Sequence, residues 1–300
     1  MNGLKRQLDK IKPQFDGTTY SFVYGDVLFI VYSHQDYWKG QYNILSGTCA
    51  YLQNDVAQWM RREVAKHPNT KWRVALVHKN LFCGSGHQID EESQLFRAIL
   101  MPVFKELHID LALQGHDHTY EVIGPVNPED KTPLLADISG VKTVEQDAST
   151  NMTGKEGGTF RTDNGTLYFV GATCGRKRYY PYSKEEMDAN YDKTKVANYY
   201  DLFTGKFGQP GAPAYTEITV NADSMVVSTY KTSVFKTRQL YDEIVIKRNA
   251  DNTYLDIHTL PAETQNDVFK TLYKGQLLIA KGQDFYDILG RKYSREELEQ

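Results

Sequence analysis

The sequence has 300 residues, enough for one large domain or for a domain with a small appendage. Hydrophobic residues at 40% and charged residues at 24% are ordinary for a globular protein. A formal net charge of −3 gives no reason to expect nucleic acid or an acidic membrane surface as a partner.

Cysteine usage and apolar runs narrow the class of protein further. Cys49, Cys83 and Cys174 are widely spaced and odd in number, so they indicate neither a zinc ribbon nor a disulfide framework. No run approaches the ~18 apolar residues of a membrane-spanning helix. The first residues lack the apolar core of a signal peptide. If the true start lies upstream, that absence says nothing about export, so the localisation stays unknown.

The first predicted elements are a strand and an amphipathic helix. Residues 22–32 form an apolar run typical of a buried strand, and His34 follows that strand. Apolar residues then recur at helical spacing at Leu52, Val56, Trp59, Met60 and Val64. This helix should end near His67, because Pro68 disfavours helical geometry in the residue before it.

A strand, a helix and a second strand are predicted next. Residues 71–77 and 109–113 are the two apolar strand patterns. Between them, apolar residues recur at helical spacing over residues 95–107, and Pro102 should kink this helix. The pattern predicts a βαβ crossover.

Both strands of this crossover end in histidine. His78 follows the first strand, and the segment Gln-Gly-His-Asp-His over residues 114–118 follows the second. Ligands bind beyond the carboxyl ends of strands in open α/β sheets, so His78, His116 and His118 should converge there. Two histidines two residues apart in an extended chain point to the same side. They could share one metal or hold two metals roughly 3.5–4 Å apart; an exposed polar turn is the alternative.

Loops after the predicted strands carry further candidate residues. Residues 83–87, Cys-Gly-Ser-Gly-His, predict a flexible loop that could border a substrate; a simple connection is the alternative. Residues 125–163 form a long segment rich in turn-forming residues, and loops of that length are usually functional or mobile. The strand pattern at 165–171 leads to Arg176 and Arg178, whose guanidinium groups could contact a phosphate; a solvated basic turn is the alternative.

The C-terminal third continues with a short helix and several strands. Ser183 to Glu186 form a capping box that opens a helix toward Tyr200. Residues 215–230 and 244–247 have strand patterns. From residue 249 the composition turns polar, and residues 275–289 predict a β-hairpin.

The histidine segments resemble a known family. Val77-His78, then a helix, then residues 109–118 resemble the last two sequence blocks of the calcineurin-like metallophosphoesterases. Thr119-Tyr120-Glu121 and the strand Tyr-Ser-Phe-Val-Tyr-Gly at residues 20–25 are similar to the purple acid phosphatase branch. The resemblance covers roughly residues 15 to 245.

This resemblance implies a fold and a reaction. The fold would be an α/β sandwich of the metallophosphoesterase type, with its second half in residues 1–248 and a polar linker and small β-hairpin appendage in residues 249–300. The activity would be metal-dependent hydrolysis of a small-molecule phosphoester, in which a metal-bound hydroxide attacks phosphorus. The cofactors would be divalent or trivalent ions, Zn, Mn or Fe, with two in a complete protein.

The resemblance also assigns roles to residues. His78 and His116 would bind one metal and His118 the other, while Asp117 would lie at the surface or beside the ligands. Apart from the resemblance, the candidate substrate-proximal residues are Arg176, Arg178, His34 and Tyr120, and for His34, where the family uses no ligand, a surface or supporting histidine is the preferred alternative.

Three blocks that family members carry before these are missing: Asp-x-His, Gly-Asp-x-x-Asp and Gly-Asn-His-Asp/Glu. Asp256-Ile257-His258 matches the first, but it lies in the polar C-terminal region and is interpreted as accidental. The catalytic residues of the first half therefore stay unknown. We expect the chain to correspond to the C-terminal half of a metallophosphoesterase, to be nearly inactive alone, and to expose a sheet edge that invites pairing.

Two alternatives stay open at this point. One is a degenerate phosphatase-like binding module without catalysis. The other is a mononuclear zinc hydrolase, since three neutral imidazoles can bind zinc and leave a fourth position for water. The number of metal ions bound per chain separates the phosphoesterase from these two alternatives. It should be near two for a complete phosphoesterase centre, near zero for the binding module and near one for the mononuclear hydrolase.

Overall fold

A computed structural model describes residues 19–33, 51–127, 142–143, 157–190, 199–232 and 237–248, and four short strands between residues 268 and 293. The chain divides into two compact units, Met1–Asn252 and Thr253–Gln300. His34 lies outside the described residues, as do the matching residues 256–258.

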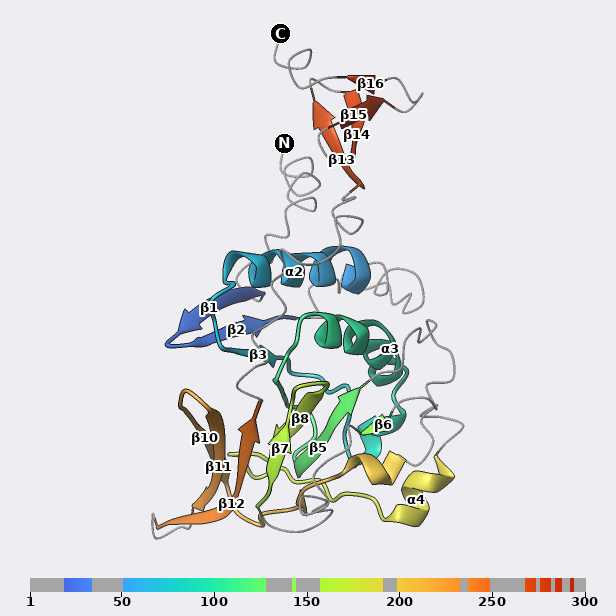
Figure 1. Cartoon of the computed structure of the whole chain (residues 1–300). Helices are drawn as coiled ribbons and strands as arrows, with labels where there is room; N and C mark the ends of the chain where they lie inside the picture. Colours follow the sequence, from blue (N-terminus) through green and yellow to red (C-terminus); the bar gives the residue numbers. More distant parts are fainter. Residues whose placement is uncertain are drawn as a thin grey trace. The chain divides into compact units, whose positions relative to one another are not determined.

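The larger sheet of the first unit contains parallel and antiparallel strands (Figure 1). In order across the sheet, the described strands are β1 (Tyr20–Tyr24), β2 (Val27–Val31), β3 (Trp72–Leu76), β4 (Leu111–Gln114), β8 (Thr166–Gly171), β5 (Tyr120–Asn127) and β6 (Lys142–Thr143), with β9 (Phe207–Gly208) paired to β5. Strands β2, β3, β4 and β8 run parallel to one another. Their carboxyl ends therefore share one edge.

The predicted βαβ crossover is confirmed by β3, α3 (Glu91–Glu106) and β4, because β3 and β4 are parallel neighbours. Pro102 lies inside α3. Phe104 of the same helix packs edge-on against Tyr32 and stacks against Tyr168, with ring centroids 6.3 Å away in both cases. These contacts fix α3 on one face of the sheet.

The single strand predicted over residues 22–32 is wrong. The chain forms a hairpin there, in which β1 and β2 pair antiparallel and Tyr24 lies opposite Val27. Gly25 has a φ of 58°, a left-handed conformation that glycine adopts without steric cost. Gly25 and Asp26 thus provide the two-residue turn that an apolar run alone did not reveal.

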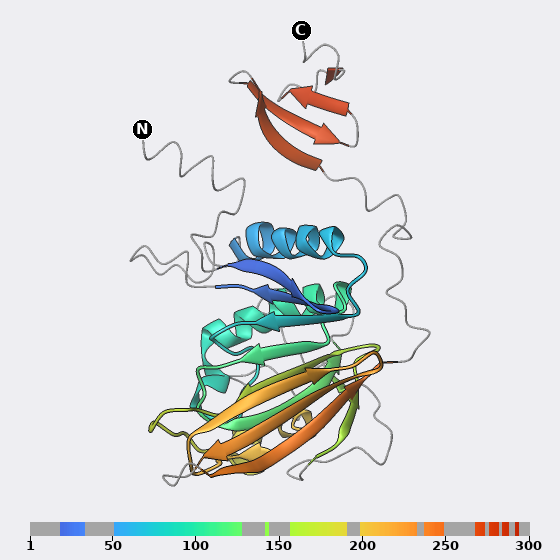
Figure 2. The same cartoon turned by 90° about the vertical axis from the view of Figure 1, so that its left-hand side faces the viewer.

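A second sheet covers the opposite face of the larger sheet (Figure 2). Its strands are β10 (Ala214–Val220), β11 (Ser224–Thr232), β12 (Arg238–Lys247) and β7 (Thr159–Arg161). Alternate residues of the larger sheet, such as Leu111, Leu167 and Phe169, pack against Met225 and Ile244 of the second sheet. This burial on both faces confirms the predicted α/β sandwich.

The other helices of the first unit are short. A π-helical turn, η2 (Tyr51–Val56), leads into α2 (Ala57–Lys66), and His67 follows it as predicted. The capping box at Ser183 and Glu186 is present and opens α4 (Lys184–Ala189). The described residues also include two 3-10 helices, η3 (Gly86–Ile89) and η4 (Tyr199–Leu202). Among the described helices, none combines the length and apolarity needed to cross a membrane.

The second unit contains an antiparallel sheet. Its described strands are β13 (Val268–Tyr273), β14 (Gln276–Lys281), β15 (Asp284–Asp287) and β16 (Lys292–Tyr293), paired in that order. The pair β14 and β15 lies within the segment for which the sequence predicted a hairpin. The division between the units falls after Asn252, four residues beyond the predicted boundary at residue 248.

Candidate metal centre

The carboxyl ends of β3 and β4 bring two predicted ligands together. His78 follows β3 and is exposed, and His116 follows β4. Their ring centroids lie 5.3 Å apart. The Gly115 N–H donates to the His78 carbonyl oxygen at 2.9 Å, and a Cβ on Gly115 would lie only 3.3 Å from His78 Nδ1. A side chain at position 115 would force His78 to shift slightly, so glycine favours this close approach of the two loops.

The backbone after β4 is not extended, contrary to the expectation for the His-x-His pair. His116 has a φ of 67°, and the Asp117 N–H donates to the Gly115 carbonyl oxygen at 2.8 Å. This tight turn removes the period-two alternation that was to place His116 and His118 on the same side. The two histidines therefore have separate surroundings.

A third histidine joins His116 from the loop after β3. The ring centroids of His87 and His116 lie 4.1 Å apart. His87 Nδ1 is 2.9 Å from Asp90 Oδ2. One ligand atom each from His87, Asp90 and His116 lies within 4.8 Å of the others, and all three residues are partly buried. These three side chains form the compact His/Asp/His cluster of the site.

Sequence reasoning missed His87 and Asp90 as candidate ligands. Both lie in or beside η3, a single 3-10 turn that has no apolar periodicity to mark it. The available signal was the His-x-x-Asp spacing, which puts two side chains near each other on one helical turn.

The loop that carries His87 is buried and bonded rather than flexible, which corrects the expectation for residues 83–87. Gln114 Oε1 accepts from the Leu81 and Phe82 N–H groups. The Cys83 N–H donates to Tyr199 Oη at 3.0 Å, and the Gly84 N–H donates to Glu121 Oε1 at 2.9 Å. Bonds from three separate segments thus hold His87 in place.

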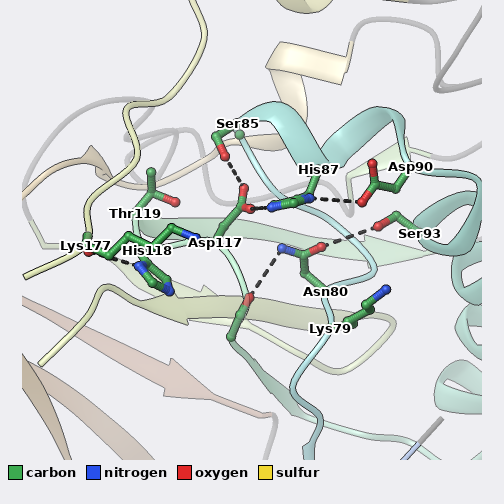
Figure 3. A network of polar contacts seen from close by, with 12 residues as sticks. Lys79, Asn80, Ser85, His87, Asp90, Ser93, Asp117, His118, Thr119 and Lys177 are labelled. Atoms are coloured by element: carbon green, nitrogen blue, oxygen red, sulfur yellow. Dashed lines mark hydrogen bonds and ion pairs between the residues drawn. The ribbon is translucent and has the colours of Figure 1, made fainter. Parts of the chain in front are cut away.

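A chain of polar contacts runs through the site (Figure 3). Ser85 Oγ donates to Asp117 Oδ2, Asp117 Oδ1 lies 3.8 Å from His87 Nε2, and His87 Nδ1 contacts Asp90. Asp117 is fully buried, and its Oδ1 accepts no hydrogen bond from the described residues. Asp117 is therefore a buried carboxylate aimed at His87.

Burial keeps one histidine of the site neutral. Burial, reinforced by neighbouring His87, Lys79 and His78, lowers the pKa of His116 to about 4. A neutral imidazole is the form that binds a metal ion. Burial also lowers the pKa of Lys79, whose ammonium pairs with Glu92. His116 is therefore ready to act as a ligand at neutral pH.

His118 lies against the loop that follows β8. Its Nδ1 is 2.9 Å from the Lys177 carbonyl oxygen, and its ring stacks on Tyr179 with centroids 5.0 Å apart. Tyr179 also contacts the His87 ring edge-on at 5.7 Å. Tyr179 thus stands between His118 and the His/Asp/His cluster.

The candidate substrate-proximal residues differ in their surroundings. Tyr120 is fully buried and donates to Asp242 Oδ2 at 2.7 Å within the core, so it is removed from the candidate contacts. Arg176 is exposed and Arg178 is partly exposed in the loop after β8. Cys83 is a buried free thiol, and burial raises its pKa well above the usual range, which disfavours a nucleophilic thiolate.

Comparisons with known proteins give distant similarities. No protein-family model matches the chain. Two curated proteins of Mycobacterium tuberculosis, the uncharacterized proteins Rv2577 (strain ATCC 25618 / H37Rv) and MT2654 (strain CDC 1551 / Oshkosh), are each 24% identical over 165 residues. The match covers 52% of this chain and 30% of each relative, so the chain spans about a third of the length of the curated relatives it matches.

A solved structure is also similar. The purple acid phosphatase PPD1 isolated from yellow lupin (Lupinus luteus) seeds aligns with a TM-score of 0.46 and 14% identity. The alignment covers 78% of this chain and 33% of the lupin chain.

The chemistry of the centre follows from its own donors. Two imidazoles and one carboxylate in reach of one point form a three-ligand set, which leaves further positions of a cation open to water or substrate. His78 lies beside this set and His118 lies across Tyr179 from it. The site at the carboxyl edge of the sheet is a candidate metal centre.

Proposed function

We propose that this chain carries the histidine part of the metal centre of a metal-dependent phosphoesterase-type hydrolase of small molecules. The observation that supports this most is the His87, Asp90 and His116 cluster beside His78, at the edge where parallel α/β sheets bind ligands. The predicted ligands His78, His116 and His118 are kept in this proposal, and His87 and Asp90 are added to them.

The donors fit a cation such as zinc, manganese or iron. Imidazole nitrogens and carboxylate oxygens both suit these metals. His116 is neutral near pH 7, and Asp90 supplies negative charge at the same point. When bound, such an ion acts as a Lewis acid on a phosphoryl oxygen and activates water. In this proposal His87, Asp90 and His116 would hold one cation, and a second site would draw on His118.

Cationic side chains around the centre would bind the negatively charged phosphate of the substrate. Arg176 and Arg178 make no ion pair with any carboxylate among the described residues, so their guanidinium groups are available for a phosphate oxygen. Lys79 is held near His116 by Glu92 and contributes positive potential there. These cations would orient a phosphoester, whereas Asp117 would hold the His87 ring.

The reaction itself needs more than these residues provide. Centres with two metals commonly rest on bridging carboxylates as well as histidines. Because the chain spans about a third of its curated relatives, we propose that the remaining donors come from sequence outside these 300 residues. The 300-residue chain should therefore bind metal and hydrolyse an aryl phosphate only slowly.

Metal content of the purified chain tests the proposal. We expect one tightly bound zinc per chain at the His87, Asp90 and His116 cluster, which His116→Ala and His87→Ala should weaken. We expect a second, weaker zinc that His118→Ala should weaken. For His116→Ala the loss should exceed the roughly 10–100-fold that supporting residues usually cost. His67→Ala, at the end of α2, and His108→Ala, ahead of β4, are matched controls that should bind zinc normally.

Three outcomes would change the proposal. Equal loss of zinc across the site and control variants would contradict the assignment of ligands. A wild-type chain without bound metal would favour the non-catalytic binding module. Aryl phosphate hydrolysis on the order of 1–10³ s⁻¹ that His116→Ala abolishes would favour a mononuclear enzyme complete within this chain.

A further inference from the structure

The loop after β8, residues 172–182, contacts three parts of the candidate centre. Its Tyr179 ring lies against both His118 and His87. The Lys177 carbonyl oxygen faces His118 Nδ1, and the Tyr182 N–H donates to the Gly84 carbonyl oxygen at 2.7 Å. Figure 3 shows the Lys177 contact beside the chain of polar groups that includes His87. The loop therefore connects the strand-end histidine to the segment that carries the cluster.

The contact at His118 decides which ring nitrogen carries the proton. A carbonyl oxygen accepts hydrogen bonds and cannot donate one. At 2.9 Å from the Lys177 oxygen, Nδ1 must therefore be the protonated nitrogen of a neutral His118. Nε2 is then left with its lone pair, which is the arrangement that a metal ligand requires.

The Tyr179 ring restricts how His118 can rotate. The two rings stack with an interplanar angle of 27°. The Lys177 ammonium lies 4.8 Å from the centroid of the Tyr179 ring, which adds a cation–π contact to the same tyrosine. Rotation of His118 away from the Lys177 carbonyl would break the ring stack.

A side-chain amide ties the backbone of these two residues together. Gln209 Nε2 donates to the His118 carbonyl oxygen at 2.7 Å and to the Tyr179 carbonyl oxygen at 2.8 Å. Gln209 lies after β9, so the bridge joins three segments that are distant in sequence. Because the backbones are held together, the ring stack and the Nδ1 contact form as one unit.

We propose that Tyr179 is a positioning residue that orients His118 and, with the Lys177 carbonyl, presents its Nε2 as a metal-binding nitrogen. This inference rests on the proposed metal centre and adds to it a specific aromatic support from the β8 loop. His118 is then oriented by a loop some sixty residues away in sequence instead of by its own strand. Tyr179 acts through His118 and need not touch the substrate.

Nitrogen-15 NMR of the histidine rings in the metal-free 300-residue chain tests the orientation directly. We expect His118, assigned by its loss in His118→Asn, to show the Nδ1–H tautomer. Tyr179→Phe keeps the ring and should keep this signature, whereas Tyr179→Ala should yield mixed tautomers. Tyr180→Ala is the matched control, because Tyr180 is 70% exposed and has no ring contact among those of the described residues.

Zinc affinity provides the second readout. We expect Tyr179→Ala to weaken binding of the second, weaker zinc, the one that His118 would ligate, by about 10–100-fold, and Tyr179→Phe or Tyr180→Ala to change it little. If Tyr179→Ala does not fold, Gln209→Ala takes its place, since it removes the amide bridge and leaves every ring intact. The same mixed tautomers and the same loss of affinity are then expected.

The outcomes separate this inference from the proposed function. A Tyr179→Ala chain that keeps the wild-type tautomer and wild-type zinc affinity overturns the inference and leaves the metal centre intact. A wild-type chain that binds no zinc overturns the proposed function, while the tautomer measurement still decides the role of Tyr179. An Nε2–H tautomer of His118 in the wild-type chain would also overturn the inference.

Discussion

Arg97 Nη1 on α3 donates a hydrogen bond of 2.7 Å to the carbonyl oxygen of Leu81, at the start of the loop that carries His87. Its Nη2 donates to the Gln88 carbonyl oxygen, at the far end of the same loop. The guanidinium is fully buried and lies near the rings of Phe82 and Tyr199. One planar group therefore spans the loop and sets the distance between its ends.

We expect Arg97→Lys to loosen this loop and to lower both stability and zinc affinity. A lysine ammonium has no fork with which to reach both carbonyl groups, and each lost hydrogen bond to a charged donor costs about 1.5–3 kcal/mol. Urea unfolding and zinc titration measure the two effects. Arg62→Lys, on the exposed side of α2, is the matched control, and an Arg97→Lys chain as stable as that control would contradict the prediction.

Glu121 should make stability fall as pH rises. Its carboxylate is fully buried, and burial, followed by the charge of Asp117, raises its pKa to about 8. Between its ordinary pKa near 4.5 and about 8, the folded chain binds more protons than the unfolded chain. The free energy of unfolding therefore decreases with pH in this window, by at most about 1.4 kcal/mol per pH unit for this one group.

Replacement of Glu121 by glutamine should remove this dependence. The glutamine carbonyl can still accept from the Gly84 N–H and from Thr119 Oγ1, the two donors that contact Glu121 Oε1. Unfolding free energies of Glu121→Gln and wild type, measured from pH 5 to pH 8, give the difference in slope. Glu217→Gln, at an exposed ion pair with Arg238, should keep the wild-type slope. Parallel curves for Glu121→Gln and wild type would refute the assignment.

The outer edge of β1 should pair with a second copy of the chain. Among the described strands, β1 pairs only with β2, and Tyr20, Phe22 and Tyr24 on one of its faces are 48%, 43% and 78% exposed. An antiparallel copy centred on Phe22 would set Tyr20 opposite Tyr24, so the edge is complementary to itself. No charged side chain interrupts β1 to prevent such pairing.

We expect a concentration-dependent dimer by light scattering, which Phe22→Glu disrupts because it places two carboxylates opposite each other. Leu240→Glu is the control, since Leu240 is similarly exposed but lies on β12, a strand of the second sheet. A monomer at all concentrations, or a dimer insensitive to Phe22→Glu, would exclude this interface.

The second unit should be dispensable for folding of the first. The chain divides into two compact units, Met1–Asn252 and Thr253–Gln300, and the described strands of each form sheets of their own. Removal of residues 253–300 should preserve a cooperative unfolding transition and zinc binding, because the ligands and the core between the two sheets lie before Asn252. A chain that loses cooperative unfolding on this truncation would show that the second unit belongs to the core.

Local sequence patterns determined the framework of this protein. Apolar strands that end in His78 and His116, with a helical pattern between them, are readable because periodicity and chain order specify a parallel crossover. The same logic placed both histidines at one edge of the sheet. The same pattern did not predict the hairpin at Gly25, because an apolar run does not show where the backbone reverses.

Tertiary structure alone decided how the centre is assembled. Asp90 and His87 meet His116 only because Arg97 and Gln114 hold the intervening loop against β4, and such contacts between distant segments leave no periodic trace in the sequence. Burial of Tyr120 follows from the second sheet, whose Asp242 accepts a hydrogen bond from the Tyr120 hydroxyl. The support of His118 by Tyr179 likewise depends on β8 lying beside β4, a pairing that local propensity does not encode.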